Sequence, residues 1–424
     1  MHMRRIDTER SEPHAGVQPV SDTFDPDAFD PHDPAFLADP YPTYALFRDR
    51  APVHLVKPYD ACWVFRYEDC VRVLGETDVW VKNPPGGEPP APGPFAMTSV
   101  FPEGLFVADP PLHTQLRELL EPVFEHSIDG ARERARQIAA PLLQAARKKG
   151  SLELVSDYAL PLPAGVLFSL LGIPEGAYGQ DIWKGLIAWQ ASIAAAHNIA
   201  EPIAVRAAGA TCSMALDWFF EGMLLTRAKS SASVPDGLVT EMSGALLEAG
   251  LSTQQVQVCA SDLLVAGYLS TTFIIGLGVR NLLLHPDQLE KLRANPSLVD
   301  SAFEEMLRFD GSVHIVDRCA GRPTELGGRT FAPGEKISLN LGSANRDPDG
   351  FAEPDRFDIE RGQTAHLAFG EGIHTCIGAP LARIVAPVAL EMLLAEFTEL
   401  TLEAAPQWQT DPYLRAMTSL PLRF

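Results

Sequence analysis

The longest helical pattern in the chain runs from Ser252 to His285, about thirty residues without a proline. Apolar side chains surround its middle instead of forming a single stripe, which is typical of a helix buried on all sides. Gly267 lies in this middle, although glycine costs about 1 kcal/mol relative to alanine inside a helix. The pattern therefore predicts a long buried helix that needs space at position 267.

Prolines and shorter apolar runs predict the other elements. These are a helix that begins near Tyr41, two hairpin strands at Val53–Val56 and Cys62–Phe65, several amphipathic helices in 130–229, a strand in Val313–Ala320 and an apolar helix over Ile377–Phe397. No internal repeat is found. The elements predict a mainly α fold with a smaller β-rich part. Residues 24–424 are expected to form one domain, and residues 1–23 a disordered or loosely attached tail.

The segment from Asn83 to Pro102 is rich in proline and glycine and cannot form regular structure. One interpretation is a flexible surface loop. However, the segment also carries Phe95, Met97 and Phe101, and its only charge is Glu88. Long loops of this kind are more often functional than idle, so a role at a binding site is the alternative.

Composition narrows the class of protein. The 424 residues are 46% hydrophobic, which suits a globular chain with an ample core. A net charge of −21 argues against nucleic acid and anionic membranes as partners. The six cysteines are scattered without a CxxC pair, and the first twenty residues contain no apolar run. We expect no signal peptide, no membrane anchor and a cytoplasmic protein.

A glycine-rich motif near the C-terminus carries the clearest chemistry. It reads Phe369-Gly370-x-Gly372-x-His374-x-Cys376-x-Gly378 and leads into the last apolar helix. The glycines permit tight turns close to a flat group. The start of a helix favours an anion, and hence a thiolate. Cys376 could be a buried structural cysteine, a nucleophile paired with a histidine, or an axial ligand of haem iron. The full spacing favours the haem ligand.

With this motif the chain resembles the cytochrome P450 superfamily, from about Phe24 to Phe424, and specifically its soluble bacterial haem-thiolate monooxygenases. The resemblance implies haem b held between a long distal helix and a proximal cysteine loop and helix. Cys376 would be the only protein ligand of the iron. The residues that would surround the haem near the loop are Phe369, Gly370, His374 and Gly378.

A second motif places His113 and Arg117 one helical turn apart. By itself this pair could be an ordinary solvated helix face, or two donors that grip a carboxylate. The resemblance implies that both hold a haem propionate, and that Arg318 is a further propionate donor.

The middle of the long helix reads Ala266-Gly267-Tyr268-Leu269-Ser270-Thr271. A packing glycine followed by hydroxyls bonded back to the helix is one interpretation. The resemblance implies instead that Ala266 borders the haem, that Gly267 leaves an oxygen-sized gap, and that Ser270 or Thr271 is catalytic. The family pattern has an acid before the hydroxyl, whereas this chain has Leu269. Proton delivery by water and hydroxyls, or by another group, therefore remains open.

Glu305 and Arg308, at positions i and i+3, would be a weak surface pair if exposed. The resemblance implies that they are buried with Arg356 and fasten the proximal loop. An arginine- and lysine-rich run within Ala131–Gly150 is most simply a solvated face, with a redox-partner contact as the alternative.

The function that the resemblance implies is insertion of one oxygen atom from O₂ into an apolar or aromatic small molecule. No flavin or iron–sulfur motif is visible, so electrons would come from a separate ferredoxin or flavodoxin and its reductase. A peroxide-using or oxidative-coupling haem-thiolate enzyme is the alternative. A haem-binding sensor is a third possibility, from another class of protein.

Overall fold

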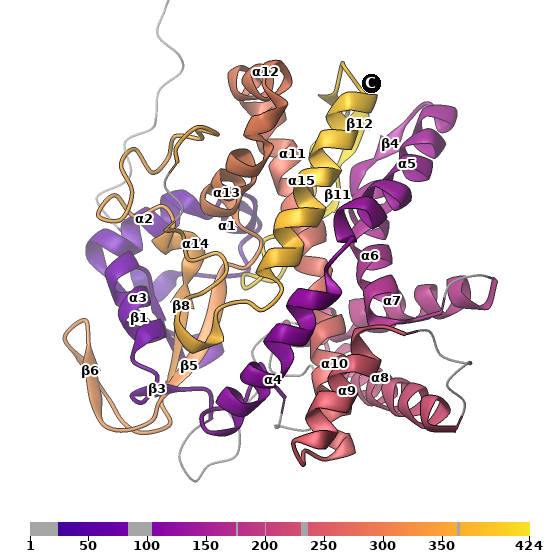
Figure 1. The fold of residues 1–424 in the computed structure, drawn as a ribbon. Coiled ribbons are helices and arrows are strands. Elements are labelled where there is room, and N and C mark those ends of the chain that lie inside the picture. The colour runs from indigo at the N-terminus through magenta and orange to yellow at the C-terminus, as the bar shows by residue number, and fades with distance from the viewer. Residues whose placement is uncertain (1–23, 84–103, 175–176, 200, 230–235, 363–364) are drawn as a thin grey trace, which may run out of the picture.

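The structure is a computed structural model that describes residues 24–83, 104–174, 177–199, 201–229, 236–362 and 365–424 (Figure 1). The predicted tail at residues 1–23, and all of the predicted proline-rich loop except Asn83, lie outside the described residues.

Helices make up most of the described chain, as predicted. They are α1 (Pro34–Ala38), α2 (Tyr41–Arg50), α3 (Tyr67–Gly75), α4 (Leu112–Ser127), α5 (Ala131–Lys149), α6 (Pro161–Leu171), α7 (Ala177–His197), α8 (Ile203–Lys229), α9 (Leu238–Glu248), α10 (Thr253–Gly267), α11 (Leu269–Leu284), α12 (Pro286–Ala294), α13 (Val299–Asp310), α14 (Leu341–Ala344) and α15 (Ala379–Glu396).

The strands are short. They are β1 (Val53–Val56), β2 (Ala61–Val64), β3 (Trp80–Val81), β4 (Leu152–Glu153), β5 (Ile315–Ala320), β6 (Thr324–Leu326), β7 (Arg329–Phe331), β8 (Lys336–Asn340), β9 (Thr401–Leu402), β10 (Gln407–Trp408), β11 (Met417–Ser419) and β12 (Pro421–Arg423). The main sheet has the order β1-β2-β8-β5-β3, in which β2 and β8 run parallel. The predicted β1–β2 hairpin is confirmed, with Val53 paired to Val64.

The main sheet lies on the left of Figure 1 together with α2, α3 and α14, and helices α4 to α11 and α15 form the rest of the molecule, so the mainly α fold with a smaller β-rich part is confirmed. The largest apolar core lies among α4–α13 and α15, and a second core lies against the sheet. The predicted last helix is also confirmed as α15, although it begins two residues later than expected. Its neighbours include α5, α11 and α13.

The predicted long helix is interrupted for one residue, at Tyr268, so it forms α10 and α11. Its burial was predicted correctly, since both halves are lined by buried side chains. Beside the break, the side-chain amide of Gln190 on α7 donates a hydrogen bond to the carbonyl of Val265. The carbonyl of Val265 thus has a partner on another helix. An irregular turn can be buried in a core when its backbone groups are paired in this way.

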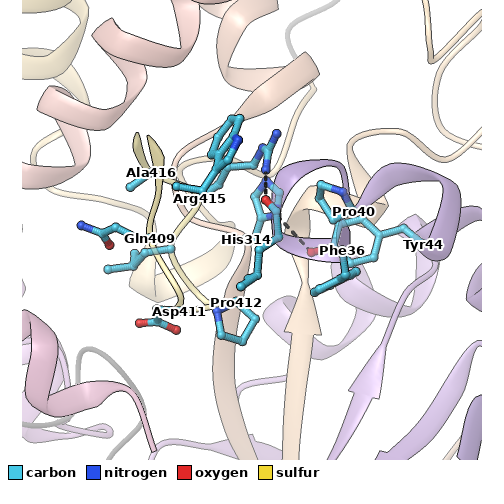
Figure 2. Close-up of a pocket in the computed structure, with 12 residues that line it drawn as sticks. Phe36, Pro40, Tyr44, His314, Gln409, Asp411, Pro412, Arg415 and Ala416 are labelled. Atoms are coloured by element: carbon cyan, nitrogen blue, oxygen red, sulfur yellow. Dashed lines mark hydrogen bonds between the residues drawn. The ribbon is translucent and has the colours of Figure 1, made fainter. Parts of the chain in front are cut away.

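A buried polar cluster joins α2 and α13 to the hairpin formed by β10 and β11. Asp310 forms an ion pair with Arg415 and accepts a hydrogen bond 2.6 Å long from Tyr41. Nearby, His314 and Tyr44 are hydrogen-bonded at 3.0 Å around a cavity of about 20 Å³ (Figure 2). The cavity has room for about one water molecule and is too small for an organic molecule. The contacts of Asp310 with Arg415 and Tyr41 hold the hairpin against α2 and α13.

Candidate cofactor site at the cysteine loop

Cys376 lies on a short loop between a single 3-10 turn, Gly372–His374, and the first residue of α15. Its backbone N–H donates a 2.9 Å hydrogen bond to the carbonyl of Phe369, which closes the loop. Of the six cysteines, Cys376 alone is exposed, whereas Cys212 is half-buried and the other four are buried. The loop therefore carries the one exposed cysteine residue of the six.

The electrostatics of this sulfur differ from the prediction. Protein atoms around the sulfur desolvate it and raise the pKa of the Cys376 thiol, while the N–H groups of Gly378 and Ala379 only partly oppose that effect. The helix start alone therefore does not produce a thiolate. A directly bound metal cation deprotonates a thiol outright, so this sulfur suits a metal ligand better than a free nucleophile.

Two glycines of the loop make tight turns, and one of them also lies close to the backbone of a neighbouring helix. Gly370 and Gly372 have φ angles of 69° and 76°, in the left-handed region that favours glycine. The predicted tight turns are thus confirmed. A Cβ at residue 372 would lie 2.6 Å from the carbonyl oxygen of Leu74. The close approach at this glycine is therefore to the backbone of α3.

Four basic side chains gather beside the loop, and we call them the basic cluster: Lys82, His113, Arg318 and His374. The rings of His113 and His374 lie 4.1 Å apart between centroids. Burial lowers the pKa of His374, and the charges of Lys82 and Arg318 lower it further. The structure thus brings together three residues that the sequence analysis proposed from separate motifs, namely His113, Arg318 and His374.

Among the described residues the basic cluster has no carboxylate at ion-pair distance, although Asp109 and Asp317 attract Lys82 and Arg318 from farther away. His113 is 1% exposed, yet neither of its ring nitrogens has a hydrogen-bond partner. Burial lowers the pKa of Arg318 to about 10 and that of Lys82 to about 7. Within the described parts of the chain, no carboxylate lies at ion-pair distance from any of the four side chains. Buried positive charge without a partner is costly, so this arrangement fits a bound group that carries carboxylates.

Sequence reasoning missed Lys82, because a single lysine after a short strand is not a motif. Its position follows from the pairing of β3 with β5, in which Val81 faces Cys319 and so places Lys82 beside Arg318. The carboxylate of Asp109 accepts hydrogen bonds from the backbone N–H groups of residues 82 and 83, which fixes the chain there. Only the pairing of β3 with β5 could have revealed this residue.

Arg117 has partners within the protein, and its role as a propionate donor stays a prediction. Its guanidinium forms a two-contact ion pair with Glu121, at 2.9 and 3.2 Å. It also donates to the carbonyl oxygen of Thr375, one residue before Cys376. Arg117 therefore ties α4 to the cysteine loop, although its positive charge still lies near the basic cluster.

Gly267 packs closely against a neighbouring helix. A Cβ at this position would come within 2.7 Å of the side chain of Leu167 on α6. Gly267 therefore allows α10 and α6 to pack closely, and the oxygen-sized gap stays a prediction. Its packing role was the alternative interpretation of the sequence.

The hydroxyls after the helix break are bonded back to the helix. Ser270 donates to the carbonyl of Ala266 at 3.2 Å, and Thr272 donates to that of Tyr268 at 3.0 Å. Thr271 is buried. Leu269 packs with Phe273 in a small apolar cluster that also contains Val313, Leu414 and Ala416. The acid position of the family pattern thus lies against apolar side chains.

Charged residues behind the loop form what we call the proximal network: Glu304, Glu305, Arg308, Arg361, His366 and Arg383. Glu305 and Arg308 are buried and joined by two 2.8 Å hydrogen bonds, as predicted. The third side chain is Arg361, 3.1 Å from Glu305. The prediction of Arg356 is wrong: its side chain is 54% exposed, and only its backbone carbonyl accepts from Arg308.

The second half of the proximal network reaches the loop itself. The carboxylate of Glu304 accepts hydrogen bonds from His366 and Arg383. Burial alone would raise the pKa of Glu304, but these two bonds outweigh it and lower the pKa to about 2. The Arg383 guanidinium lies 4.6 Å from the centre of the Phe369 ring, which joins the network to the cysteine loop.

Comparison with known proteins identifies the family to which the chain is similar. The family model for cytochrome P450 matches residues 226–421. The chain is 33% identical to the cytochrome P450 monooxygenase PikC of Streptomyces venezuelae over 92% of each chain. It is 31% identical to the 6-deoxyerythronolide B hydroxylase of Saccharopolyspora erythraea, over 92% of this chain and 97% of that one. Among solved structures, P450BioI in complex with an acyl carrier protein ligated to a fatty acid matches with a TM-score of 0.82. That match has 28% identity and covers 92% of this chain and 99% of that one.

Proposed function

The chain belongs to the cytochrome P450 family, whose members bind haem b through an axial cysteine thiolate, and we propose that Cys376 is that ligand here. The chain is a haem-thiolate monooxygenase. We propose that it inserts one oxygen atom from O₂ into an apolar or aromatic small molecule, in the cytoplasm. The observation that carries the assignment of residues is the single exposed cysteine beside a basic cluster in which the buried ring nitrogens of His113 have no hydrogen-bond partner.

The fit between this site and haem rests on the basic cluster. Haem carries two propionates, and the unpaired nitrogens of His113 offer them a hydrogen-bond donor. Lys82 and Arg318 would supply charge, and His374 joins the cluster to the cysteine loop, two residues before Cys376. Ala266, Phe369, Gly370 and Gly378 are the other proposed neighbours of the haem, and Arg117 would hold the loop through Thr375.

When bound, haem supplies the activation of O₂, and a thiolate ligand favours cleavage of the O–O bond. The chain's own residues must then exclude water and move protons. Leu269 and Phe273 provide an apolar wall with the β10–β11 hairpin. Ser270 and Thr271 are the proposed proton-handling hydroxyls. Since position 269 has no carboxylate, we propose that they work through ordered water.

Electrons are proposed to come from a separate ferredoxin or flavodoxin with its reductase. The arginine-rich run on α5 does not by itself support a docking site for such a partner. Arg132 and Arg136 lie 3.7 and 3.5 Å from Glu391 of α15, and Arg147 is paired with Glu396. These contacts favour the solvated-face interpretation of that run.

A peroxide-using enzyme is the second candidate, because Leu269 replaces the acid that precedes the hydroxyl in the family pattern. The two functions are separated by isotopically labelled O₂, supplied with NADPH and a surrogate ferredoxin and reductase. Substrates would first be chosen by their shift of the Soret band in a compound panel. Monooxygenation predicts label in the product and a dependence on all three protein components. Unlabelled product that forms only with added peroxide would contradict it.

A further inference from the structure

Helix α8 has an outward face that is mostly apolar over about five turns, with the half-buried Glu221 as its charge. Between Ala207 and Thr226, every described side chain classed as exposed is uncharged. The large ones are Met214, Trp218 and Leu225, which are 42%, 65% and 51% exposed, and Ile203 at the start of the helix is 84% exposed. Spacings of four, seven and eleven residues place these four on one side of the helix. Exposed apolar patches of this kind mark contact surfaces.

The opposite side of α8 is already fully used. There, Gly209 faces α7 so closely that a Cβ would lie 2.2 Å from the Cβ of Ala196. Phe220 and Leu216 are buried in the main core. The outward apolar side chains are therefore additional to the face that folds the helix into the protein.

Large and small side chains are unevenly distributed along this face. Ala204, Ala207 and Thr211 occupy its N-terminal half, whereas Trp218 and Leu225 occupy its C-terminal half. The Thr211 hydroxyl donates to the Ala207 carbonyl, so the threonine needs no further hydrogen-bond partner. One half of the face is therefore shallow, and the other half carries the projecting rings and branches.

We propose that this face pairs two copies of the chain, with their α8 helices antiparallel about a two-fold axis near Ser213 and Met214. In a two-fold interface the same surface is used by both copies, so each projection must meet a depression on the same face. With this axis, Trp218 lies opposite position 209, between Ala207 and Thr211 of the second copy. Ile203 lies opposite position 224, beside the second copy's Leu225.

Charges at the edge of the face agree with this pairing. The same axis places Arg206 opposite Glu221 of the second copy, and both residues lie on the same flank of the helix. In an antiparallel pair, equal flanks face each other, so two complementary contacts form. Within one helix, the two residues are fifteen positions apart, or about 22 Å, and cannot reach each other.

A membrane surface is a poorer occupant of this face. Helices that lie on anionic membranes carry lysine and arginine along the polar side, and this chain has a net charge of −21. A second copy needs no such charge, and it offers the small side chains Ala207 and Thr211 opposite Trp218.

The first experiment compares the haem-loaded wild type with Trp218→Glu by sedimentation velocity, up to about 100 μM protein. A central aromatic residue of an interface is often a hot spot, so the substitution should weaken self-association at least about 30-fold. Leu247→Glu on α9, where the leucine is 48% exposed, is the matched control and should leave self-association unchanged. The Soret spectrum and thermal unfolding of each variant confirm that the fold is intact.

The second experiment tests the antiparallel register by charge reversal. Arg206→Glu and Glu221→Arg should each weaken the dimer by about 3- to 10-fold, and the double variant should recover most of the loss. A wild type that stays monomeric at every concentration would overturn the proposal. A dimer that is insensitive to Trp218→Glu, or a double variant weaker than both single ones, would overturn this interface.

Discussion

Two groups of charged side chains flank the cysteine loop, and they differ in how their charges are paired. In the proximal network each carboxylate is matched, since Glu305 contacts both Arg308 and Arg361 and Glu304 contacts His366 and Arg383. In the basic cluster, no described carboxylate lies at ion-pair distance, and the nitrogens of His113 have no partner. The first arrangement is paired within the protein, whereas the second leaves donors for the anionic ligand that we propose.

The comparison separates residues that hold the fold from residues that hold a ligand. Removing one member of a buried, paired network leaves a charge without compensation, and stability falls whether or not a ligand is present. Removing a member of an unpaired cluster relieves repulsion in the protein without ligand, and weakens binding of the ligand. Substitutions in the two groups should therefore change the free energy of unfolding in different directions.

The largest effect is expected from Arg308→Ala. This change leaves Glu305 buried with one partner fewer, and it removes the donors to the carbonyls of Asn345, Pro354 and Arg356. We expect a loss of about 3 to 5 kcal/mol in the free energy of unfolding, and little haem-containing protein. Arg356→Ala is the control and should cost at most about 1 kcal/mol, because that side chain is exposed. Urea unfolding and haem content measure both, and equal losses would break the comparison.

The pH dependence of stability tests the second pair of the proximal network. The pKa of Glu304 falls from 4.5 to about 2 on folding. Because the folded pKa is the lower one, the stabilisation is complete above about pH 4.5 and is lost as the pH falls toward 2. We expect the wild type to lose about 3 kcal/mol more than Glu304→Gln over this range. Parallel pH profiles of the two proteins in urea unfolding would show that the network is not coupled to Glu304.

Lys82→Met should give the opposite signature. Haem should dissociate about 3- to 10-fold faster, because a charge facing its carboxylates is lost. The haem-free protein should be as stable as the wild type or more stable, because burial already disfavours the charged lysine. Haem transfer to apomyoglobin and urea unfolding measure these two effects. Lys148→Met, at an exposed position of α5, is the control. If Lys82→Met lost both stability and haem, Lys82 would belong with the structural charges.

The smallest effects are expected on the distal helix, which offers hydroxyls instead of charges. Ser270→Ala should be milder than loss of the corresponding threonine in an ordinary family member, because Ser270 already donates to Ala266. Leu269→Glu should change the amount of NADPH consumed per product, since it places a carboxylate in an apolar cluster beside the hydroxyls. Product yield against reductant consumed is the measurement. Unchanged coupling in Leu269→Glu together with no hydroxylation in Ser270→Ala would contradict both expectations.

Much of the fold followed from the sequence because its signals are local. Apolar periodicity located the buried helix at Ser252–His285, and prolines and short apolar runs located the β1–β2 hairpin. The one-residue break at Tyr268 could not be predicted, because it depends on Gln190 from another helix and on the packing of Gly267 against Leu167.

For the site, the sequence supplied the residues that belong to motifs and missed those set by tertiary pairing. The motifs and the family resemblance predict Cys376, His113, Arg318 and His374 as haem-site residues. Lys82 was missed because only the pairing of β3 with β5 places it near the others. The sequence predicted Arg356 in the position that Arg361 occupies, because Arg356 lies in the proline-containing motif and only burial distinguishes the two.

The central claim is that Cys376 is the axial ligand of the haem iron, and the carbon monoxide complex of the reduced protein tests it directly. The wild type should show the red-shifted Soret band of a thiolate-ligated haem. Cys376→Ser should lose this band even when it still contains haem, because serine offers no sulfur ligand. Retention of the red-shifted band in Cys376→Ser would contradict the account and would require another of the six cysteines as the ligand.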